Sequence, residues 1–248
     1  MATDLRPAQL PNQPPPVRRS ALESVHRALA GNASTNAQRW PTSYGDPDGE
    51  RRAVASAIGL GEPGLFDKLL VRGPGALIEA RAAGLRAEPG RVTPADEIAG
   101  VNVWAIAEDE LFLLVLAPPA GSQIQRAVSV PRLASSLAGG DVAVTDLSSG
   151  WSVLRLVGPN VRSLLEELIV SDVSADAIAD LRILQVTMAN CRVVIARQDL
   201  GVVPGFTLLV ARDEAEHLWD VLVERGAAYG LRPVGALALQ PGTRDGDR

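Results

Sequence analysis

A sequence of 248 residues is long enough for one large domain or two small ones, and it can bury enough surface to fold without a disulfide or a structural metal. Hydrophobic residues make up 46% of it and charged residues 21%, as in an ordinary soluble globular protein. The formal net charge of −5 argues against nucleic acid or an anionic membrane surface as a partner.

Both ends of the chain are predicted to be disordered. Residues 1–17 are rich in proline and poor in apolar side chains, so this segment cannot bury enough surface to offset its chain entropy. This segment is either a disordered tail or an arm that lies along a partner subunit. Residues 241–248 are polar, and we expect them to be frayed.

Helical patterns open the first half of the chain. Ser20 is the predicted N-cap, because Glu23 follows three residues later and completes a capping box. Residues 47–58 form a second helical pattern, and Gly59 is its expected stop.

Strand patterns follow in the same half. Residues 69–71 form a short strand that ends at Gly73-Pro74, and a helical pattern covers 76–83. Two β-rich runs, 101–107 and 111–116, are separated by three acidic residues that suit a hairpin turn.

The second half repeats this order. A strand ends at Gly158-Pro159, 85 residues after Gly73-Pro74, and a helix, two strands and another helix follow. The expected elements are a strand at 153–157, a helix at 161–168, strands at 193–196 and 206–210, and a helix at 213–225. The repeat predicts an α+β protein with two related halves, 18–140 and 141–240, each with an antiparallel sheet and packed helices.

The residues by themselves point to no catalytic chemistry. Cys191 is the only cysteine, which excludes an intrachain disulfide and a cysteine-based metal site, and His26 and His217 lack a second histidine at metal-ligand spacing. His217 is expected on the solvated surface, His26 at the surface or in partly buried packing, and Cys191 in the core. Residues 59–64 spell a dinucleotide-binding glycine pattern, but they follow a helix, so we expect only a turn between a helix and a strand. Apolar runs are much shorter than the roughly 20 residues of a spanning helix, so we expect a cytoplasmic protein with no membrane partner.

Several sequence blocks between residues 39 and 238 resemble the T-protein, the aminomethyltransferase of the glycine cleavage system. Their order and spacing carry the resemblance more than any one of them. The blocks are Arg39-Trp40, Tyr44-Gly45, Glu50, Leu65 to Pro74, Gly100 to Ile106, Val144 to Ser148, Leu154 to Pro159, Arg197, Pro204 to Phe206, and Tyr229 to Ala236.

The resemblance implies a folate-binding scaffold in which tetrahydrofolate lies between two α+β lobes and collects a one-carbon unit from an aminomethyl donor. The family also carries a C-terminal β-barrel, and we expect this chain to lack it. Transfer needs a carboxylate near the reacting nitrogen and polar side chains that satisfy the pterin.

This sequence departs from the family at those positions. The acidic pair of the family falls at Asn102-Val103, its tyrosine at Leu200 and its pterin-holding glutamate at Thr207. A later arginine of the family falls at Leu239. We therefore expect no catalytic residue and a scaffold that has lost the reaction.

Four residues remain as candidates for binding a folate. Asn102 can donate or accept a hydrogen bond, and Trp104 and Phe206 can stack on a pterin ring. Arg197 is kept at its family position. For each of them the alternative is a structural role. Asn102, Trp104 and Phe206 would then pack on or beside a sheet, and Arg197 would be solvated or ion-paired.

The sequence also resembles the barrel-less gamma subunit of heterotetrameric sarcosine oxidase, above all from Asp141 to Leu222. That resemblance implies an accessory subunit of a flavin-dependent N-methyl amine oxidase or demethylase, with flavin held by larger partner subunits. Whether the chain takes part in catalysis stays open.

Two other functions remain. The first is a stand-alone tetrahydrofolate-dependent aminomethyltransferase-like protein. The second is a folate-binding iron–sulfur maintenance factor of the same superfamily, although the cysteine-containing motif of that family is absent here.

Overall fold

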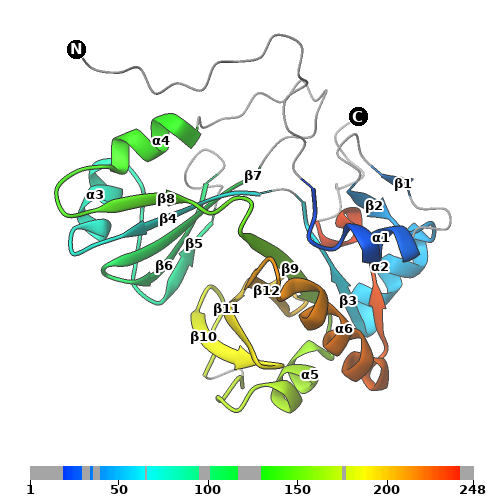
Figure 1. Ribbon diagram of the computed structural model, residues 1–248. Coiled ribbons are helices and arrows are strands. Elements are labelled where there is room, and N and C mark those ends of the chain that lie inside the picture. The colour runs from blue at the N-terminus through cyan, green and yellow to red at the C-terminus, as the bar shows by residue number, and fades with distance from the viewer. Residues whose placement is uncertain are drawn as a thin grey trace, which may run out of the picture.

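The computed structural model describes residues 19–29, 34–35, 40–64, 66–94, 101–116, 130–174 and 177–240. It contains two lobes, each built around a largely antiparallel sheet (Figure 1). The predicted disordered segments 1–17 and 241–248 lie outside the described residues.

The first lobe contains a five-stranded antiparallel sheet in the order β5-β6-β7-β4-β8. Its strands are β4 (Phe66–Arg72), β5 (Arg91–Thr93), β6 (Val101–Ala107), β7 (Glu110–Leu116) and β8 (Ala143–Asp146). Helices α3 (Ala76–Ala82) and α4 (Val130–Leu137) pack on one face of it, over Val71, Val103 and Leu113.

The second lobe contains a six-stranded sheet in the order β10-β11-β12-β9-β3-β13. Its strands are β3 (Ile58–Gly61), β9 (Trp151–Val157), β10 (Ile183–Met188), β11 (Cys191–Arg197), β12 (Gly205–Ala211) and β13 (Leu231–Pro233). Only β13 pairs in parallel, with β3, so the structure confirms the predicted α+β class.

Helices cover the outer face of the six-stranded sheet. Its core joins Phe206 and Leu208 to Leu22, Leu164 and Trp219, which come from the segment before α1 and from α5 and α6. The helices are α1 (Glu23–Leu29), α5 (Val161–Leu168) and α6 (Ala215–Gly226).

Helix α2 (Pro47–Ser56) packs with β3 and the 3₁₀ helix η3 (Ala236–Leu239) at one end, beside the two-stranded pair β1 (Ser34–Thr35) and β2 (Pro41–Ser43). Another 3₁₀ turn, η2 (Ala227–Tyr229), follows α6. Within the described residues, no helix is both long and apolar enough to cross a membrane.

The predicted hairpin of 101–107 and 111–116 is confirmed, and the helices expected at 76–83, 161–168 and 213–225 are present within two residues. The expected stop of α2 is wrong. Helix α2 ends at Ser56, and Gly59 lies inside β3, so residues 59–64 are not simply a turn. A Cβ at Gly59 would stand 2.6 Å from Val54 Cγ2, which means that glycine lets α2 pack closely on this strand.

The repeated glycines occupy equivalent turns. Gly73 and Gly158 both have strongly positive φ angles, 142° and 152°, which favour glycine. Each carbonyl accepts a hydrogen bond from the first residue of the following helix, Ala76 at 2.9 Å and Val161 at 3.3 Å. The internal repeat that the sequence predicts is therefore present in the backbone.

Each sheet contains one strand that comes, in the sequence, directly before a strand of the other sheet. Strand β3 comes directly before β4 but pairs with β9 in the six-stranded sheet. Strand β8 comes directly before β9 but pairs with β4 in the five-stranded sheet. The two lobes thus exchange strands across residue 140. The division of the chain into two domains near this residue stays a prediction.

Backbone hydrogen bonds also join the two sheets at their β5 and β10 edges. Val92 N donates to Leu181 O at 2.8 Å, and Ile183 N donates to Gly90 O at 2.9 Å. With the strand exchange, these bonds hold the inner faces of the two sheets against one another.

Asp46 caps helix α2, and we expect its contribution to depend on pH. Its Oδ1 accepts a hydrogen bond from Gly49 N at 3.0 Å, and this bond, helped by Arg232, lowers the pKa of the carboxyl. A lowered pKa stabilises the fold above the ordinary value of 3.8, and this stabilisation is lost as pH falls through the folded value. Asp46→Ala should therefore be less stable than the parent in urea unfolding at neutral pH, with a gap that closes in acid.

Asp48→Ala is the matched control, because Asp48 is exposed like Asp46 and lies in the first turn of the same helix, but its carboxylate accepts from the Arg51 side chain instead of from Gly49 N. It should change stability less at neutral pH. A gap for Asp46→Ala that stays constant with pH would contradict this role of the carboxylate.

Candidate functional site

The inner faces of the two sheets enclose an apolar layer. Side chains alternate along each strand, so Trp104 of β6 and Phe112 of β7 turn away from helices α3 and α4. They meet Val153, Val194 and Leu209 from the six-stranded sheet. Any site between the lobes must be formed by polar residues that interrupt this layer.

Asn102 lies on the same face of β6 as Trp104, two residues away. It is half-buried, and its cross-strand neighbour is Leu114, which in turn pairs with Lys68 of β4. Asn102 and Lys68 therefore belong to one row across the sheet, facing the second lobe. An amide at Asn102 can hydrogen-bond a ligand but cannot serve as a carboxylate base.

Trp104 is almost completely buried, at 1% exposure, between the two sheets. Its Nε1 has no hydrogen-bond partner among the described residues. In this arrangement the ring packs the interface of the two lobes.

Phe206 lies on the other side of the six-stranded sheet. It is fully buried with Leu208 in the core under the helices, and the Arg162 guanidinium lies 5.7 Å from its ring centre. The six-stranded sheet thus separates Phe206 from Asn102 and Trp104, so the structure does not bring the predicted aromatic residues together.

Arg197 holds the loop that follows β11. Its guanidinium donates to both carboxylate oxygens of Asp199, at 3.0 and 2.7 Å, and to Ile178 O at 2.9 Å. The hydrogen bonds to Asp199 raise the pKa of Arg197. Asp199 also accepts from Gly205 N, which ties the loop to β12. Arg197 is thus engaged within the chain.

Sequence reasoning missed Arg155, a polar side chain on the inner face of β9. It donates to Gln198 O at 3.2 Å and to Thr207 Oγ1 at 3.5 Å, and its Nε has no partner among the described residues. Burial lowers the pKa of Arg155, while Asp199 and Asp180 oppose the shift. The only signal in the sequence was the period of two along the strand, which places Arg155 on the same face as the apolar Val153.

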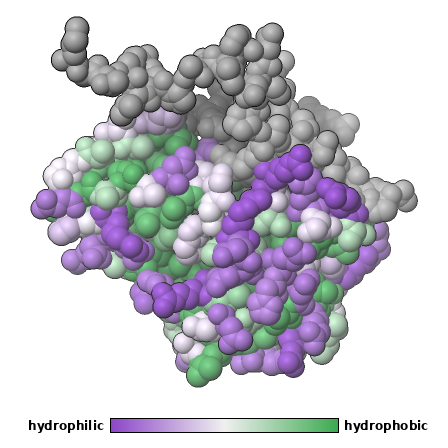
Figure 2. Space-filling model, in the orientation of Figure 1, coloured by the Kyte–Doolittle hydropathy of each residue, from purple (hydrophilic) through white to green (hydrophobic). Residues whose placement is uncertain are grey.

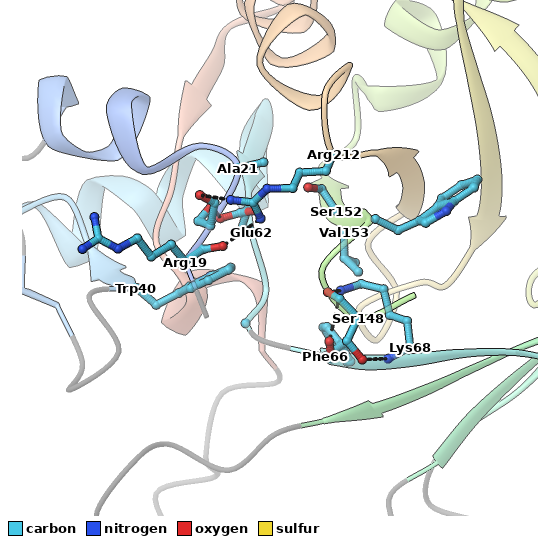
Figure 3. Close-up of a pocket in the computed structure, with 13 residues that line it drawn as sticks. Arg19, Ala21, Trp40, Glu62, Phe66, Lys68, Ser148, Ser152, Val153 and Arg212 are labelled. Atoms are coloured by element: carbon cyan, nitrogen blue, oxygen red, sulfur yellow. Dashed lines mark hydrogen bonds between the residues drawn. The ribbon is translucent and has the colours of Figure 1, made fainter. Parts of the chain in front are cut away.

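Lys68, the only lysine of the sequence, is also buried on an inner face, at 4% exposure. Its Nζ donates to Phe66 O at 3.0 Å and to Ser148 O at 3.2 Å (Figure 3). These bonds clamp the segment between β8 and β9 onto β4.

A small cavity adjoins Lys68 where the two lobes meet the segment before α1. Figure 3 shows Lys68 and Ser148 on one side of it, and Glu62, Trp40 and Arg212 on the other. Its volume of about 20 Å³ suits a single water molecule and is far below the size of a ligand pocket. This cavity cannot hold a pterin.

A chain of buried hydrogen bonds runs from this cavity under α1. Glu62 Oε2 accepts from Ser20 Oγ at 2.5 Å and lies 2.7 Å from His26 Nε2, and His26 Nδ1 lies 2.7 Å from Tyr44 Oη. Burial raises the pKa of Tyr44, so its hydroxyl stays protonated.

His26 is therefore buried, at 5% exposure, and both of its ring nitrogens are engaged, so it lies deeper than the surface or partly buried position that was expected. The expectation failed because the partners Glu62 and Tyr44 lie far away in the sequence, 36 and 18 residues on. His217 lies on the exposed face of α6, as predicted, with its Nε2 3.0 Å from Ala189 O.

The described residues contain no group of three His, Cys, Asp or Glu side chains placed to hold a metal ion. Cys191 is buried, and burial raises the pKa of its thiol. Its environment is therefore that of a packing residue rather than of a reactive thiolate.

Comparison with known sequences shows where this architecture recurs. The family described as the GCVT N-terminal domain matches residues 98–241, which is more than half of the chain. The aminomethyltransferase of Streptomyces avermitilis is 30% identical over 229 residues, which cover 88% of this chain and 60% of that protein. The aminomethyltransferase of Halothermothrix orenii is 26% identical over 232 residues, which cover 88% of this chain and 62% of that protein. The chain thus spans less than two thirds of the length of these curated relatives.

Two solved structures share the fold. A chain of the heterotetrameric sarcosine oxidase from Corynebacterium sp. U-96 matches with a TM-score of 0.62 and 22% identity, covering 89% of this chain and 100% of that chain. The glycine cleavage system aminomethyltransferase T from Bartonella henselae matches with a TM-score of 0.67 and 19% identity, covering 90% of this chain and 61% of that chain. The fold is that of the T-protein-like scaffold.

Proposed function

This chain belongs to the GCVT N-terminal domain family of aminomethyltransferase-like proteins, and from that premise we propose that it is a non-catalytic accessory subunit of a multi-subunit flavin-dependent N-methyl amine oxidase or demethylase. In this function the flavin is held by larger partner subunits, and the chain binds tetrahydrofolate weakly at most. The proposed location is the cytoplasm.

The coverage of the two structural matches carries this proposal. The whole of the matched sarcosine oxidase chain is covered, whereas only 61% of the aminomethyltransferase T chain is. The part of this chain that matches the sarcosine oxidase chain therefore corresponds to an entire chain of a heterotetrameric oxidase. A chain of this kind works beside other subunits.

The chemistry of the inner faces supports the same proposal. Aminomethyl transfer needs a carboxylate that can take up or deliver a proton near the folate nitrogen. The position expected for it is Asn102, an amide, and the position expected for a pterin-holding glutamate is Thr207, whose hydroxyl faces Arg155. A ligand there would meet a cationic guanidinium where the reaction calls for acidic groups.

Affinity purification of this chain from its native host, followed by mass spectrometry, tests the proposal. We expect large flavin-binding chains in a fixed ratio, with flavin absorbance in the same chromatographic peak. Recovery of the chain alone, as a stable monomer without flavin, would overturn the accessory function.

A second candidate function is stand-alone, tetrahydrofolate-dependent one-carbon transfer. The half-buried Asn102 amide, which faces the second lobe, is the observation that favours it. In this function the isolated chain binds tetrahydrofolate saturably, and Asn102→Leu weakens binding about tenfold, because one hydrogen bond to the ligand is lost.

Isothermal titration with tetrahydrofolate measures this difference, and Asn160→Leu is the matched control because the Asn160 amide donates to Tyr229 O, away from the inner faces. Equal affinity of the parent and Asn102→Leu, or no binding by the parent, would reject this function.

A further inference from the structure

An open groove of about 410 Å³ runs between the two sheets at the end opposite Arg155 and Arg197. Its floor is apolar and is formed by Leu70, Phe112, Trp151 and Val194. The rings of Phe112 and Trp151 lie 5.2 Å apart at 58°. None of the four predicted folate-binding residues lines this groove.

One wall of the groove is the edge strand β10, which is the last strand of its sheet. In an antiparallel ladder the backbone groups of alternate residues point to opposite edges. Ile183 N points outward, to Gly90 O of the first lobe, so the backbone groups of Gln185 and Thr187 point to the same outer edge. Within the described residues no further strand pairs there, and both side chains are exposed.

The rim of the groove carries one uncompensated positive charge. Arg72 pairs with Glu110 at 2.6 Å, whereas Arg192, directly opposite Thr187 in the β10–β11 ladder, is exposed and has no ion-pair partner among the described residues. A carboxylate that followed β10 would therefore meet a free guanidinium.

We propose that this groove receives an extended acidic segment of a partner subunit, which adds a strand to β10, places one aromatic or aliphatic side chain on the Phe112–Trp151 floor and pairs a carboxylate with Arg192. This inference rests on the accessory function proposed above and names the surface and the partner chemistry.

An extended segment fits these features better than a compact ligand. Strand addition uses the main-chain groups of the edge for affinity and the neighbouring pockets for specificity. Only the stretch Gln185–Thr187 is open, which is roughly 10 Å of strand at about 3.3 Å per residue. So short a ladder needs the apolar anchor and the ion pair to hold the segment.

The first test uses the purified full-length chain and two short fluorescein-labelled peptides. Both alternate valine with charged residues around one phenylalanine, and the charges are glutamate in one and lysine in the other. We expect saturable binding of the glutamate peptide only. Arg192→Glu should weaken it at least about tenfold, because a favourable ion pair becomes a repulsion. Thr187→Pro should weaken it similarly, because proline removes a donor from the edge.

Arg225→Glu is the control, because Arg225 is an exposed arginine on α6 that does not line the groove. It should leave peptide binding unchanged. Equal binding of the two peptides, or binding that survives Arg192→Glu, would overturn the proposed occupant. Self-association of the chain that is abolished by Arg192→Glu would assign the groove to a second copy instead.

The second test separates this inference from the accessory function. A photo-cross-linking residue at Gln185, with Arg225 as the control position, is carried through purification of the native complex. We expect the Gln185 probe to label one acidic segment of a flavin-binding chain. Recovery of the partner without a Gln185 cross-link would overturn the groove proposal alone, whereas absence of any partner would overturn the accessory function.

Discussion

Gly158→Ala should lower the free energy of unfolding by about 3–4 kcal/mol, a large effect for one methyl group. The φ angle of Gly158 is 152°, in a region that side chains rarely adopt, and a Cβ there would stand 2.1 Å from Ala57 O. The obstacle is the backbone at the entrance to β3, which cannot swing aside. Urea unfolding of the parent and the variant measures the difference.

Gly201→Ala separates the steric effect from the effect of the φ angle. Gly201 also has a positive φ, 63°, but a Cβ there would meet nothing within 4 Å. We expect a cost of about 1–2 kcal/mol from the left-handed conformation alone. Gly73→Ala should resemble Gly158→Ala, because its Cβ would stand 2.0 Å from Asp141 O. Equal costs for Gly158→Ala and Gly201→Ala would refute the proposed clash.

Glu50→Ala should destabilise the chain by about 3–5 kcal/mol, because it leaves several buried donors without an acceptor. Glu50 is 2% exposed, and its Oε1 accepts from Ser43 Oγ at 2.8 Å and from Tyr44 N at 2.6 Å. Its Oε2 accepts from Gly235 N at 2.8 Å, so one carboxylate joins β2, α2 and the segment before η3. Chemical denaturation followed by circular dichroism measures the loss.

Two further variants locate the origin of this effect. Glu50→Gln keeps the shape and one acceptor oxygen, and we expect an intermediate loss of about 1–3 kcal/mol. Glu88→Ala removes an exposed glutamate, with 73% of its side chain accessible, and should stay within about 0.5 kcal/mol of the parent. If Glu50→Ala cost no more than Glu88→Ala, the buried carboxylate would not hold these elements together.

The hairpin of β6 and β7 and the helices α3, α5 and α6 could be predicted because each is long and has a consistent local pattern. The short strands β3, β5, β8 and β13 could not, because three or four residues give no clear period. In β3 the glycines at 59 and 61 suggested a turn, but they are there because Val54 and Val234 approach the backbone closely.

The candidate site was predictable only in part. The period of two along β6 correctly places Asn102 and Trp104 on one face, but it cannot say that Phe206 faces the opposite core. Arg155 was missed because a single arginine in a strand usually reaches solvent, whereas here burial removes it from solvent and it donates to Gln198 O and Thr207 Oγ1, which lie far along the chain.

The sequence by itself determined the α+β class and the internal repeat at Gly73 and Gly158, because these depend on residue identity and local spacing. The tertiary structure alone decided that β3 pairs with β9 in the six-stranded sheet and that β8 pairs with β4 in the five-stranded sheet. It also decided that His26 is bound to Glu62, and that β10 offers an open edge beside an apolar groove. Each of these depends on contacts between residues far apart in the chain, whose partners no local pattern specifies.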